Sequence, residues 1–384
     1  METAGPHLAG GFCMDSSGKQ AMKIIVMAHP RDDHTAPVLW ALEQAGYRAS
    51  CWSGVSWEEQ DQAGLFLGQR PEMTLGALKL ENDDALWLRQ PDQPPHDPAV
   101  SNASKKFADY PAFFNALAYM LESLPVRCIN TYSASCLIRN KGVQLHLAGT
   151  SGLNIPATLM SNSPAAVRDF FDHYPNNAIC KAFASHVWQQ QGSEDISVTE
   201  TFCLTREQLP TDDEVFTYAP AIYQEMVVKQ FDVRVVLMGE RIYSYALRTP
   251  ENSLDWRFDA ARKNLAVEVI STPPDVEAGL HLFAQKTGIC FGVLDFAVDR
   301  NGQWWFLEIN EQGQFLWLDQ FNLDSSLLQK FCAFLTAAQN HGQSLEKRQD
   351  LFPSLTEYAQ CHKNEEALTI ASDVPGASYK SIEP

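Results

Sequence analysis

Hydrophobic and polar positions at the start of the chain predict a strand, a helix and a second strand. Residues 23–28 form a short apolar run, which is typical of a buried strand. Apolar residues recur at helical spacing over residues 38–45, and Gly46 stands where a glycine commonly ends a helix. Residues 47–52 have the pattern of the next strand. This succession predicts an α/β domain that begins near residue 22.

The same organisation continues past a long loop. Residues 29–35, which follow the first strand, lack the G-x-G-x-x-G pattern, so no dinucleotide site is predicted there. Residues 90–100 are rich in proline and predict a loop that no helix or strand crosses. Beyond it, residues 107–121 and 141–148 have helical patterns, and residues 126–130 resemble a strand.

The pattern changes from residue 179 onward, where short apolar runs alternate with short polar turns. We predict successive strands at residues 179–183, 185–189, 196–204, 222–228, 233–238 and 242–246. A helix that includes residues 282–287 follows, and then two strands, 293–298 and 304–309, joined by a turn at 299–302. The second part of the chain is therefore rich in sheet, and the predicted fold class is mixed α/β and α+β.

Charge and composition narrow the classes of partner. Lysine plus arginine number 29 against 47 aspartate plus glutamate, which gives a formal charge of −18. We expect no binding to a nucleic-acid backbone or an anionic membrane, because long-range repulsion opposes the encounter. A few local cations and a metal ion can still bind a nucleotide in a cleft. No apolar run is long enough to span a bilayer, and nine scattered cysteines without C-x-x-C favour reduced thiols in a cytoplasm.

The strongest chemical signal lies on the last two predicted strands. Asp295 falls within the first strand, and Glu308 and Asn310 fall on the second. Residues two apart on a strand point to the same face, so Glu308 and Asn310 project together, and a paired strand can place Asp295 opposite them. Three side-chain oxygens on one face suit a hard cation such as Mg²⁺. A solvated sheet face is the alternative, but polar oxygens within otherwise apolar strands favour the metal site.

Two weaker signals precede this triad. Residues 224–234 combine an acid with an Asp232-x-Arg234 step into a strand, which could offer an adenine edge, a ribose contact and a cation, or could be surface charge. Lys181 lies in an apolar strand-like run, and Lys141 opens a predicted helix. Burying a lysine without an anion is costly, although a lysine at a sheet edge often extends to solvent. The lysines gain weight because they occur together with the metal-type triad.

Over residues 22–335 the chain resembles the ATP-grasp superfamily, and within it the microviridin-type (graspetide) ligases, which build ω-ester or ω-amide links in ribosomal peptides. The segments that carry the resemblance are 140–145, 152–159, Lys181, 224–234, 255–257 and 308–319. The triad is general to the superfamily, whereas the run 310–317, with its asparagine, glycine, glutamine and tryptophan, is most specific to the branch. The hairpin after Lys181 departs from the superfamily pattern because it has no glycine-rich phosphate loop.

The resemblance implies a three-lobed ATP-grasp architecture: an N-terminal α/β domain, a central lid and a C-terminal mixed lobe, with ATP between the last two. We expect five segments along the chain. They are a disordered leader at 1–21, the N-terminal α/β domain at 22–135, the lid at 136–215, the C-terminal lobe at 216–342 and a polar tail at 343–384.

The resemblance also implies a nucleotide site. Lys141 and Lys181 match the family's phosphate-binding lysines. Glu225 and the backbone at Val227 would meet adenine, and Asp232 would reach the ribose.

Two arginines and the triad match the family's reacting centre. Arg234 and Arg257 resemble the cations that hold the γ-phosphate and the reacting carboxylate. Asp295, Glu308 and Asn310 match the Mg²⁺ ligands. The implied reaction is carboxylate activation: a carboxylate attacks the γ-phosphate of ATP, ADP leaves, and a hydroxyl or amine displaces phosphate from the acyl phosphate.

The leading hypothesis is therefore an ATP-dependent ligase that acts on a side-chain carboxylate of a ribosomal precursor peptide. A ligase that joins small molecules such as amino acids is an alternative. A non-catalytic scaffold that binds a nucleotide or a peptide is another. The resemblance suggests a homodimer.

Overall fold

A computed structural model gives the architecture. It describes residues 22–28, 32–54, 62–89, 109–174, 178–183, 187–189, 196–198, 202–249, 256, 265–322, 324–337 and 348–362. The chain divides into two compact units, which are described separately: unit 1 (1–129 and 328–358) and unit 2 (130–327 and 359–384). The five-segment division expected from the resemblance stays a prediction.

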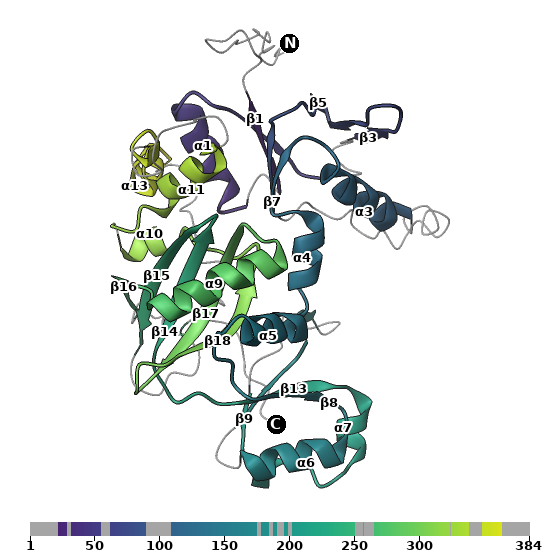
Figure 1. The fold of residues 1–384 in the computed structure, drawn as a ribbon, viewed down its shortest axis with the longest axis vertical. Coiled ribbons are helices and arrows are strands. Elements are labelled where there is room, and N and C mark those ends of the chain that lie inside the picture. The colour runs from purple at the N-terminus through teal and green to yellow at the C-terminus, as the bar shows by residue number, and fades with distance from the viewer. Residues whose placement is uncertain are drawn as a thin grey trace. The chain divides into compact units, whose positions relative to one another are not determined.

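Unit 1 is built on a parallel sheet with the strand order β2-β1-β6-β7 (Figure 1). The strands are β1 (Lys23–Met27), β2 (Arg48–Trp52), β6 (Ala85–Leu88) and β7 (Arg127–Ile129), and α1 (Thr35–Gln44) joins the first two. The central strand β1 is almost wholly buried, as its apolar run predicts. The strand–helix–strand prediction for the start of the chain is therefore confirmed.

Unit 1 also holds elements that the apolar pattern did not indicate. A small antiparallel sheet consists of β3 (Ala63–Phe66), β4 (Glu72–Leu75) and β5 (Leu78–Lys79). The predicted aromatic helix is present as α3 (Asp109–Leu121), and α11 (Leu327–Leu335) lies near the end of the chain.

Part of the segment expected to be a polar tail is folded. Residues 348–362 include α13 (Leu355–Cys361), and Leu355 and Tyr358 on this helix are buried. Tyr358 packs edge-on against Trp40 of α1, with ring centroids 5.3 Å apart. The helix forms because apolar residues three positions apart share one face, and this face packs onto α1.

Unit 2 contains a five-stranded sheet, called here the large sheet, in which every pair of neighbouring strands is antiparallel. In the order β16-β15-β14-β17-β18, its strands are β16 (Ala266–Ile270), β15 (Arg241–Arg248), β14 (Lys229–Met238), β17 (Phe291–Asp299) and β18 (Trp304–Asn310). The predicted strands at 233–238, 242–246, 293–298 and 304–309 are all confirmed.

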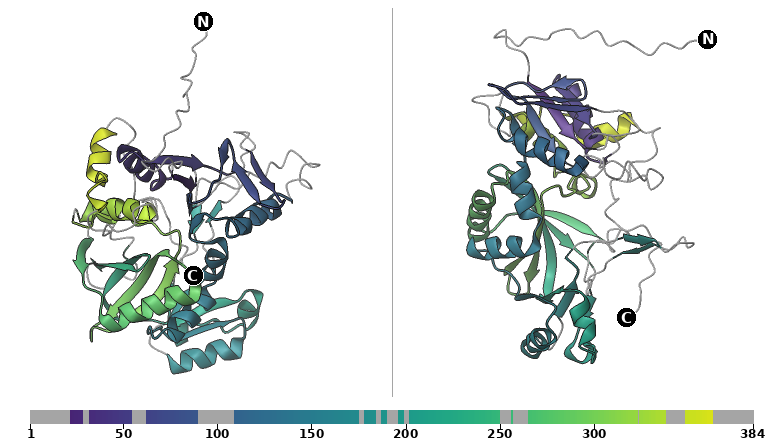
Figure 2. Two further views of the ribbon diagram at one scale, coloured as in Figure 1. Left: turned by 45° about the horizontal axis from the view of Figure 1, so that its top comes forward. Right: turned by 90° about the vertical axis from the view of Figure 1, so that its right-hand side faces the viewer.

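Three helices cover one face of the large sheet: α4 (Tyr132–Ile138), α5 (Lys141–Thr150) and α9 (Pro274–Thr287). Figure 2 shows α5 and α9 on the same side of this sheet. Buried side chains such as Val235 and Phe283 form the core between sheet and helices. Burial of one such side chain contributes about 1.5–3 kcal/mol to folding, so this face anchors the unit.

The small sheet of unit 2 has the order β12-β9-β13-β8, with antiparallel neighbours. Its strands are β8 (Thr158–Ser161), β9 (Ala178–Lys181), β12 (Phe202–Leu204) and β13 (Ala221–Glu225). The strand predicted at 196–204 is instead two, β11 (Ile196–Val198) and β12, and β11 pairs with β10 (Val187–Gln189). The remaining short helices of unit 2 are η1 (Arg206–Gln208) and α10 (Leu318–Phe321).

Helices α6 (Pro164–His173) and α7 (Glu214–Tyr218) pack on one face of the small sheet. Phe171 and Phe216 of these helices share a buried cluster with Tyr223 of β13. Burial raises the pKa of Tyr223 to about 12, so its phenol stays neutral. One face of the small sheet is thus closed by apolar packing.

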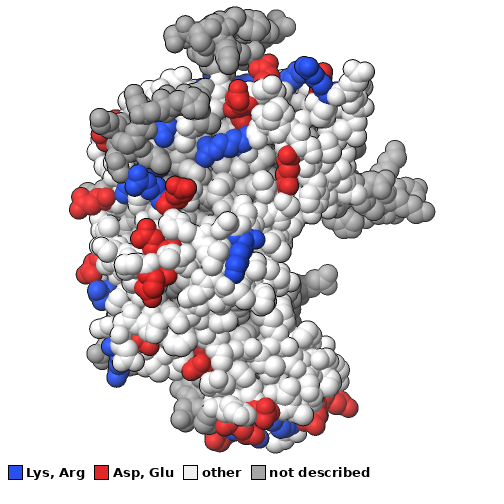
Figure 3. Space-filling view, in the orientation of Figure 1, with Lys and Arg blue, Asp and Glu red and all other residues white. Residues whose placement is uncertain are grey.

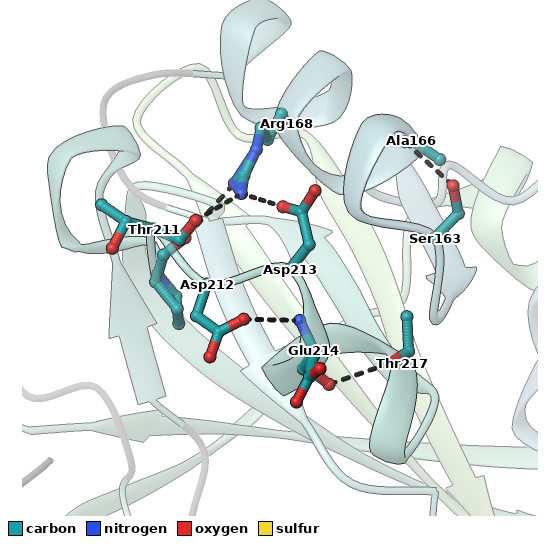
Figure 4. Close-up of polar contacts among 9 residues, drawn as sticks. Ser163, Ala166, Arg168, Thr211, Asp212, Asp213, Glu214 and Thr217 are labelled. Carbon is teal, nitrogen blue, oxygen red and sulfur yellow. Dashed lines mark hydrogen bonds and ion pairs between the residues drawn. The ribbon is translucent and has the colours of Figure 1, made fainter.

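Polar contacts connect α6 to the segment before α7 (Figure 4). The Arg168 guanidinium donates to the carbonyl of Thr211 and pairs with the Asp213 carboxylate. Ser163 caps α6 by accepting from the amide of Ala166. Charged side chains, many of them acidic, gather at this end of unit 2 (Figure 3).

Two negative expectations can be compared with the described residues. No helix within them has the length and apolarity that a membrane crossing requires. Their cysteines are free thiols, consistent with the absence of a disulfide framework: Cys51, Cys128, Cys136, Cys180, Cys203, Cys290, Cys332 and Cys361.

Candidate active site

The face of the large sheet opposite the helices carries charged side chains in register. Arg234 of β14 pairs with Asp295 of β17, which in turn pairs with Glu308 of β18. Val293, two residues before Asp295, is the partner of Asn310. Since alternate residues of a strand share a face, the predicted triad of Asp295, Glu308 and Asn310 lies on one side of a single strand pair.

Arg234 is held tightly on this face. Its Nη1 donates to both carboxylate oxygens of Asp295, each at 3.0 Å, and its Nη2 donates to the carbonyl of Gln314 at 2.8 Å. The Arg234 side chain is 8% exposed and that of Asp295 is 23% exposed. Removing either partner would leave a poorly solvated charge, so the pair acts as one unit.

The carbonyl that binds Arg234 is placed by a tight turn after β18. The side chain of Asn310 accepts from the amide of Gln312 at 2.9 Å, and the Gly313 amide donates to the Asn310 carbonyl at 3.2 Å. A Cβ on Gly313 would come within 2.7 Å of the Cβ of Val293, so only glycine fits this close approach. The turn therefore folds back over β17 and brings Gln314 to the arginine.

Aromatic side chains surround the same arginine. The Trp256 ring lies 5.6 Å from the Arg234 guanidinium carbon and stacks on Trp317 with ring centroids 4.9 Å apart. Tyr245 is the β15 partner of Arg234 and is buried. Burial raises the pKa of Tyr245 well above its usual range, and the Asp319 carboxylate adds to this effect, so the phenol is neutral.

Lys141 approaches the same face from α5. It is the first residue of that helix, after Asn140, whose side chain caps the helix by accepting from the amide of Val143 at 3.0 Å. The Lys141 Nζ lies 3.8 Å from an oxygen of Glu308. Two cations, Arg234 and Lys141, thus each contact one of two carboxylates.

The open face of the small sheet carries Lys181. In β13, Ile222 is its partner, and Gln224 lies on the same face two residues later. The Lys181 Nζ donates to the side-chain oxygen of Gln224 at 2.9 Å, and the Gln224 amide nitrogen donates to the Thr158 hydroxyl at 3.0 Å. The sequence indicated the lysine, but Gln224 as its partner depends on strand register.

The other predicted nucleotide contacts lie where the small sheet continues into the large one. Glu225 ends β13, and its amide donates to the carbonyl of Ala157 at 2.8 Å. Val227 lies in the three-residue segment between β13 and β14. Asp232 is buried and accepts from the Lys229 Nζ at 2.6 Å. A shift in register between Lys229 and Phe231 fits two residues three apart on one strand meeting.

The predicted site is thus only partly brought together. Arg234, Asp295, Glu308 and Lys141 form one continuous cluster, and Asn310 shares its strand pair. Arg257 lies outside the described residues.

The donor set of this cluster fits a hard divalent cation. Two carboxylates and one amide oxygen on one face are the ligand types that Mg²⁺ prefers. Both carboxylates already contact cations at the distances given above, so the local charge is balanced. The described residues contain no other group of three or more His, Cys, Asp or Glu side chains suited to a metal.

Comparisons with known proteins bear on the fold. No protein-family model matches the chain, and no curated protein sequence matches it. Among solved structures, the RiPP-associated ATP-grasp ligase of Chryseobacterium gregarium, in complex with ADP and a leader and core peptide, matches with a TM-score of 0.70 at 19% identity. The match covers 83% of this chain and 98% of that one.

Two further structures agree. The macrocyclase MdnC of Microcystis aeruginosa, bound with the precursor peptide MdnA, matches with a TM-score of 0.69 at 22% identity over 83% of this chain and all of that one. The ATP-grasp ligase PsnB, complexed with a phosphomimetic minimal precursor, Mg and ADP, matches with a TM-score of 0.67 at 20% identity over 84% and 99%. The chain therefore has the fold of the ATP-grasp ligases, as the sequence resemblance predicted.

Proposed function

We propose that this chain is an ADP-forming ligase that activates a carboxylate as an acyl phosphate and joins it to a hydroxyl or amine. The substrate that we propose is a ribosomal precursor peptide, cyclised through side-chain ester or amide links. The fold supports this because the three similar structures are named as ATP-grasp ligases or a macrocyclase, each with a peptide bound. Fold alone does not define function, so the argument rests on the site.

The observation that carries the proposal is the charged cluster on the open face of the large sheet. Arg234 pairs with Asp295, and Lys141 lies beside Glu308. With two positive and two negative groups, the cluster has little net attraction for a free divalent cation. A metal that arrives with the phosphates of a nucleotide brings its own negative charge, so the balanced cluster suits the metal–nucleotide pair.

Each cation would then have a defined role. Lys141 and Lys181 would bind the nucleotide phosphates, while Asp295, Glu308 and Asn310 would hold Mg²⁺, which neutralises phosphate charge when bound. Arg234, with Arg257 from outside the described residues, would orient the substrate carboxylate toward the γ-phosphate. Such positioning and charge neutralisation are the main catalytic contributions in phosphoryl transfer.

The nucleotide base would lie at the segment between the two sheets. Glu225 and the backbone at Val227 would contact adenine, and Asp232 would approach the ribose. In the subsequent step, the hydroxyl or amine of the substrate attacks the acyl carbon and loses its proton, and inorganic phosphate leaves.

The experiment that tests the proposal is ADP release with a defined peptide. The chain is incubated with ATP, Mg²⁺ and a short peptide rich in Thr, Ser, Lys, Asp and Glu that is encoded beside its gene. We expect ADP formation that depends on the peptide, and a peptide mass that falls by one water per ring. ADP formation with free amino acids instead would favour the small-molecule ligase, and nucleotide binding without turnover on either would favour the scaffold.

A further inference from the structure

The edge of the large sheet next to the candidate metal ligands is closed by one side chain. β18 is an edge strand, so its outward backbone groups need partners other than a neighbouring strand. At Ile309, the amide donates to Oε1 of Gln144 at 3.1 Å, and the carbonyl accepts from Nε2 of Gln144 at 3.0 Å. The carboxamide therefore pairs with Ile309 as a further strand would.

The same side chain is fixed from its other side. Nε2 of Gln144 also donates to the carbonyl of Ile138, the last residue of α4, at 2.6 Å. Gln144 is 5% exposed, so these hydrogen bonds are shielded from water. Its donors and its acceptor are thus all used, and the carboxamide has one orientation.

The position of Ile309 gives this contact its significance. Ile309 lies between Glu308 and Asn310, so its peptide groups set the direction in which both side chains leave the strand. Gln144 follows Lys141 by three residues on α5, which places both on one side of the helix. The Lys141 Nζ lies 3.8 Å from Glu308. One carboxamide thus links the strand of the ligands to the helix of the lysine.

We propose that Gln144 is a positioning residue of the metal–nucleotide site: it holds Glu308 and Asn310 in the orientation that a metal-bound nucleotide requires, with Lys141 beside them. This rests on the proposed function. Groups that orient metal ligands without touching the metal commonly change metal affinity by about 10–100-fold when removed.

A purely structural role for a buried amide has a counterpart in the same unit. Asn130 is 2% exposed, donates to the carbonyl of Phe291 at 2.8 Å and accepts from the amides of Cys290 and Phe291. It pairs with the start of β17, four residues before Asp295, or about 13 Å along the strand. Asn130 therefore provides a matched control with the same chemistry and burial.

The experiment compares Gln144→Met with Asn130→Leu by calorimetric titration with a non-hydrolysable ATP analogue, in Mg²⁺ and in EDTA. Methionine keeps the length of glutamine and cannot form these hydrogen bonds. We expect both variants to unfold at lower temperature. The gain in nucleotide affinity on adding Mg²⁺ should fall by about 10–100-fold in Gln144→Met and stay at the wild-type value in Asn130→Leu.

Equal loss of the Mg²⁺-dependent gain in both variants, or its retention in Gln144→Met, would overturn the inference. The proposed function fails separately, if the wild-type chain itself binds no nucleotide in Mg²⁺.

Amide hydrogen exchange on the wild-type chain tests the same coupling without a substitution. Because coupling between two sites is reciprocal, the nucleotide with Mg²⁺ should protect the Ile309 amide more than the nucleotide in EDTA does. Equal protection under both conditions would contradict the role of Gln144.

Discussion

The two antiparallel sheets of unit 2 share a design and differ in how they hold charge. Each has one face closed by helices over apolar side chains and another that carries the candidate site residues. On the small sheet, the Lys181 ammonium donates to a neutral amide, Gln224, which in turn donates to Thr158. On the large sheet, Arg234 and Lys141 contact carboxylates.

The difference has an energetic consequence. An arginine bonded to a buried carboxylate depends on it, because loss of the partner leaves a charge that water solvates poorly. A lysine that donates to an amide has no such dependence on an opposite charge at that contact. Substitutions on the large sheet should therefore lower both stability and activity, whereas substitutions on the small sheet should affect ligand binding alone.

Asp295→Asn should produce the largest effect. It keeps the shape of the side chain and removes the charge opposite Arg234, so we expect the free energy of unfolding to fall by about 2–3 kcal/mol in urea titrations. Turnover, measured as ADP release, should fall by about 10²–10³-fold because the site loses a charged group that acts on the phosphates.

Asp299→Asn on the same strand is the matched control for that prediction. Asp299 accepts from the amides of Asn301 and Gln303 in the turn after β17, and asparagine keeps an acceptor oxygen. Its turnover should equal that of the wild type. A stability loss no larger in Asp295→Asn than in Asp299→Asn would remove the distinction between the two sheets.

Lys181→Met should produce a smaller effect, confined to binding. A hydrogen bond from a charged donor contributes about 1.5–3 kcal/mol, so the dissociation constant of a non-hydrolysable ATP analogue should rise about tenfold or more. The unfolding temperature should change little. The control is Lys286→Met, since the Lys286 Nζ donates to the carbonyl of Thr150 on α5. Equal affinities in the two variants would show that Lys181 does not meet the nucleotide.

The part of the site that the sequence predicts is the part that local contacts determine. Asp295 and Glu308 face each other because a short turn joins β17 to β18, and alternation within one hairpin fixes the shared face. Arg234 opposite Asp295 could not be predicted in the same way. It depends on β14 pairing with β17 across an intervening hairpin and helix, and no local pattern specifies that pairing.

Buried amides were missed for a related reason. Gln144 and Asn130 are ordinary polar residues in the sequence, and their function depends on backbone groups more than 100 residues away. The helix after residue 354 did have a local signal. Phe352, Leu355 and Tyr358 recur every three residues within a polar segment, and this spacing predicts a buried helical face.

The measurement that tests the central claim most directly is thermal unfolding of the wild type and Glu308→Gln with a non-hydrolysable ATP analogue, with and without Mg²⁺. A ligand at 100 times its dissociation constant stabilises by about 2.7 kcal/mol, a shift of several degrees. The account predicts a shift that needs Mg²⁺ in the wild type and is lost in Glu308→Gln. An equal Mg²⁺-dependent shift in both, or no shift in the wild type, would contradict it.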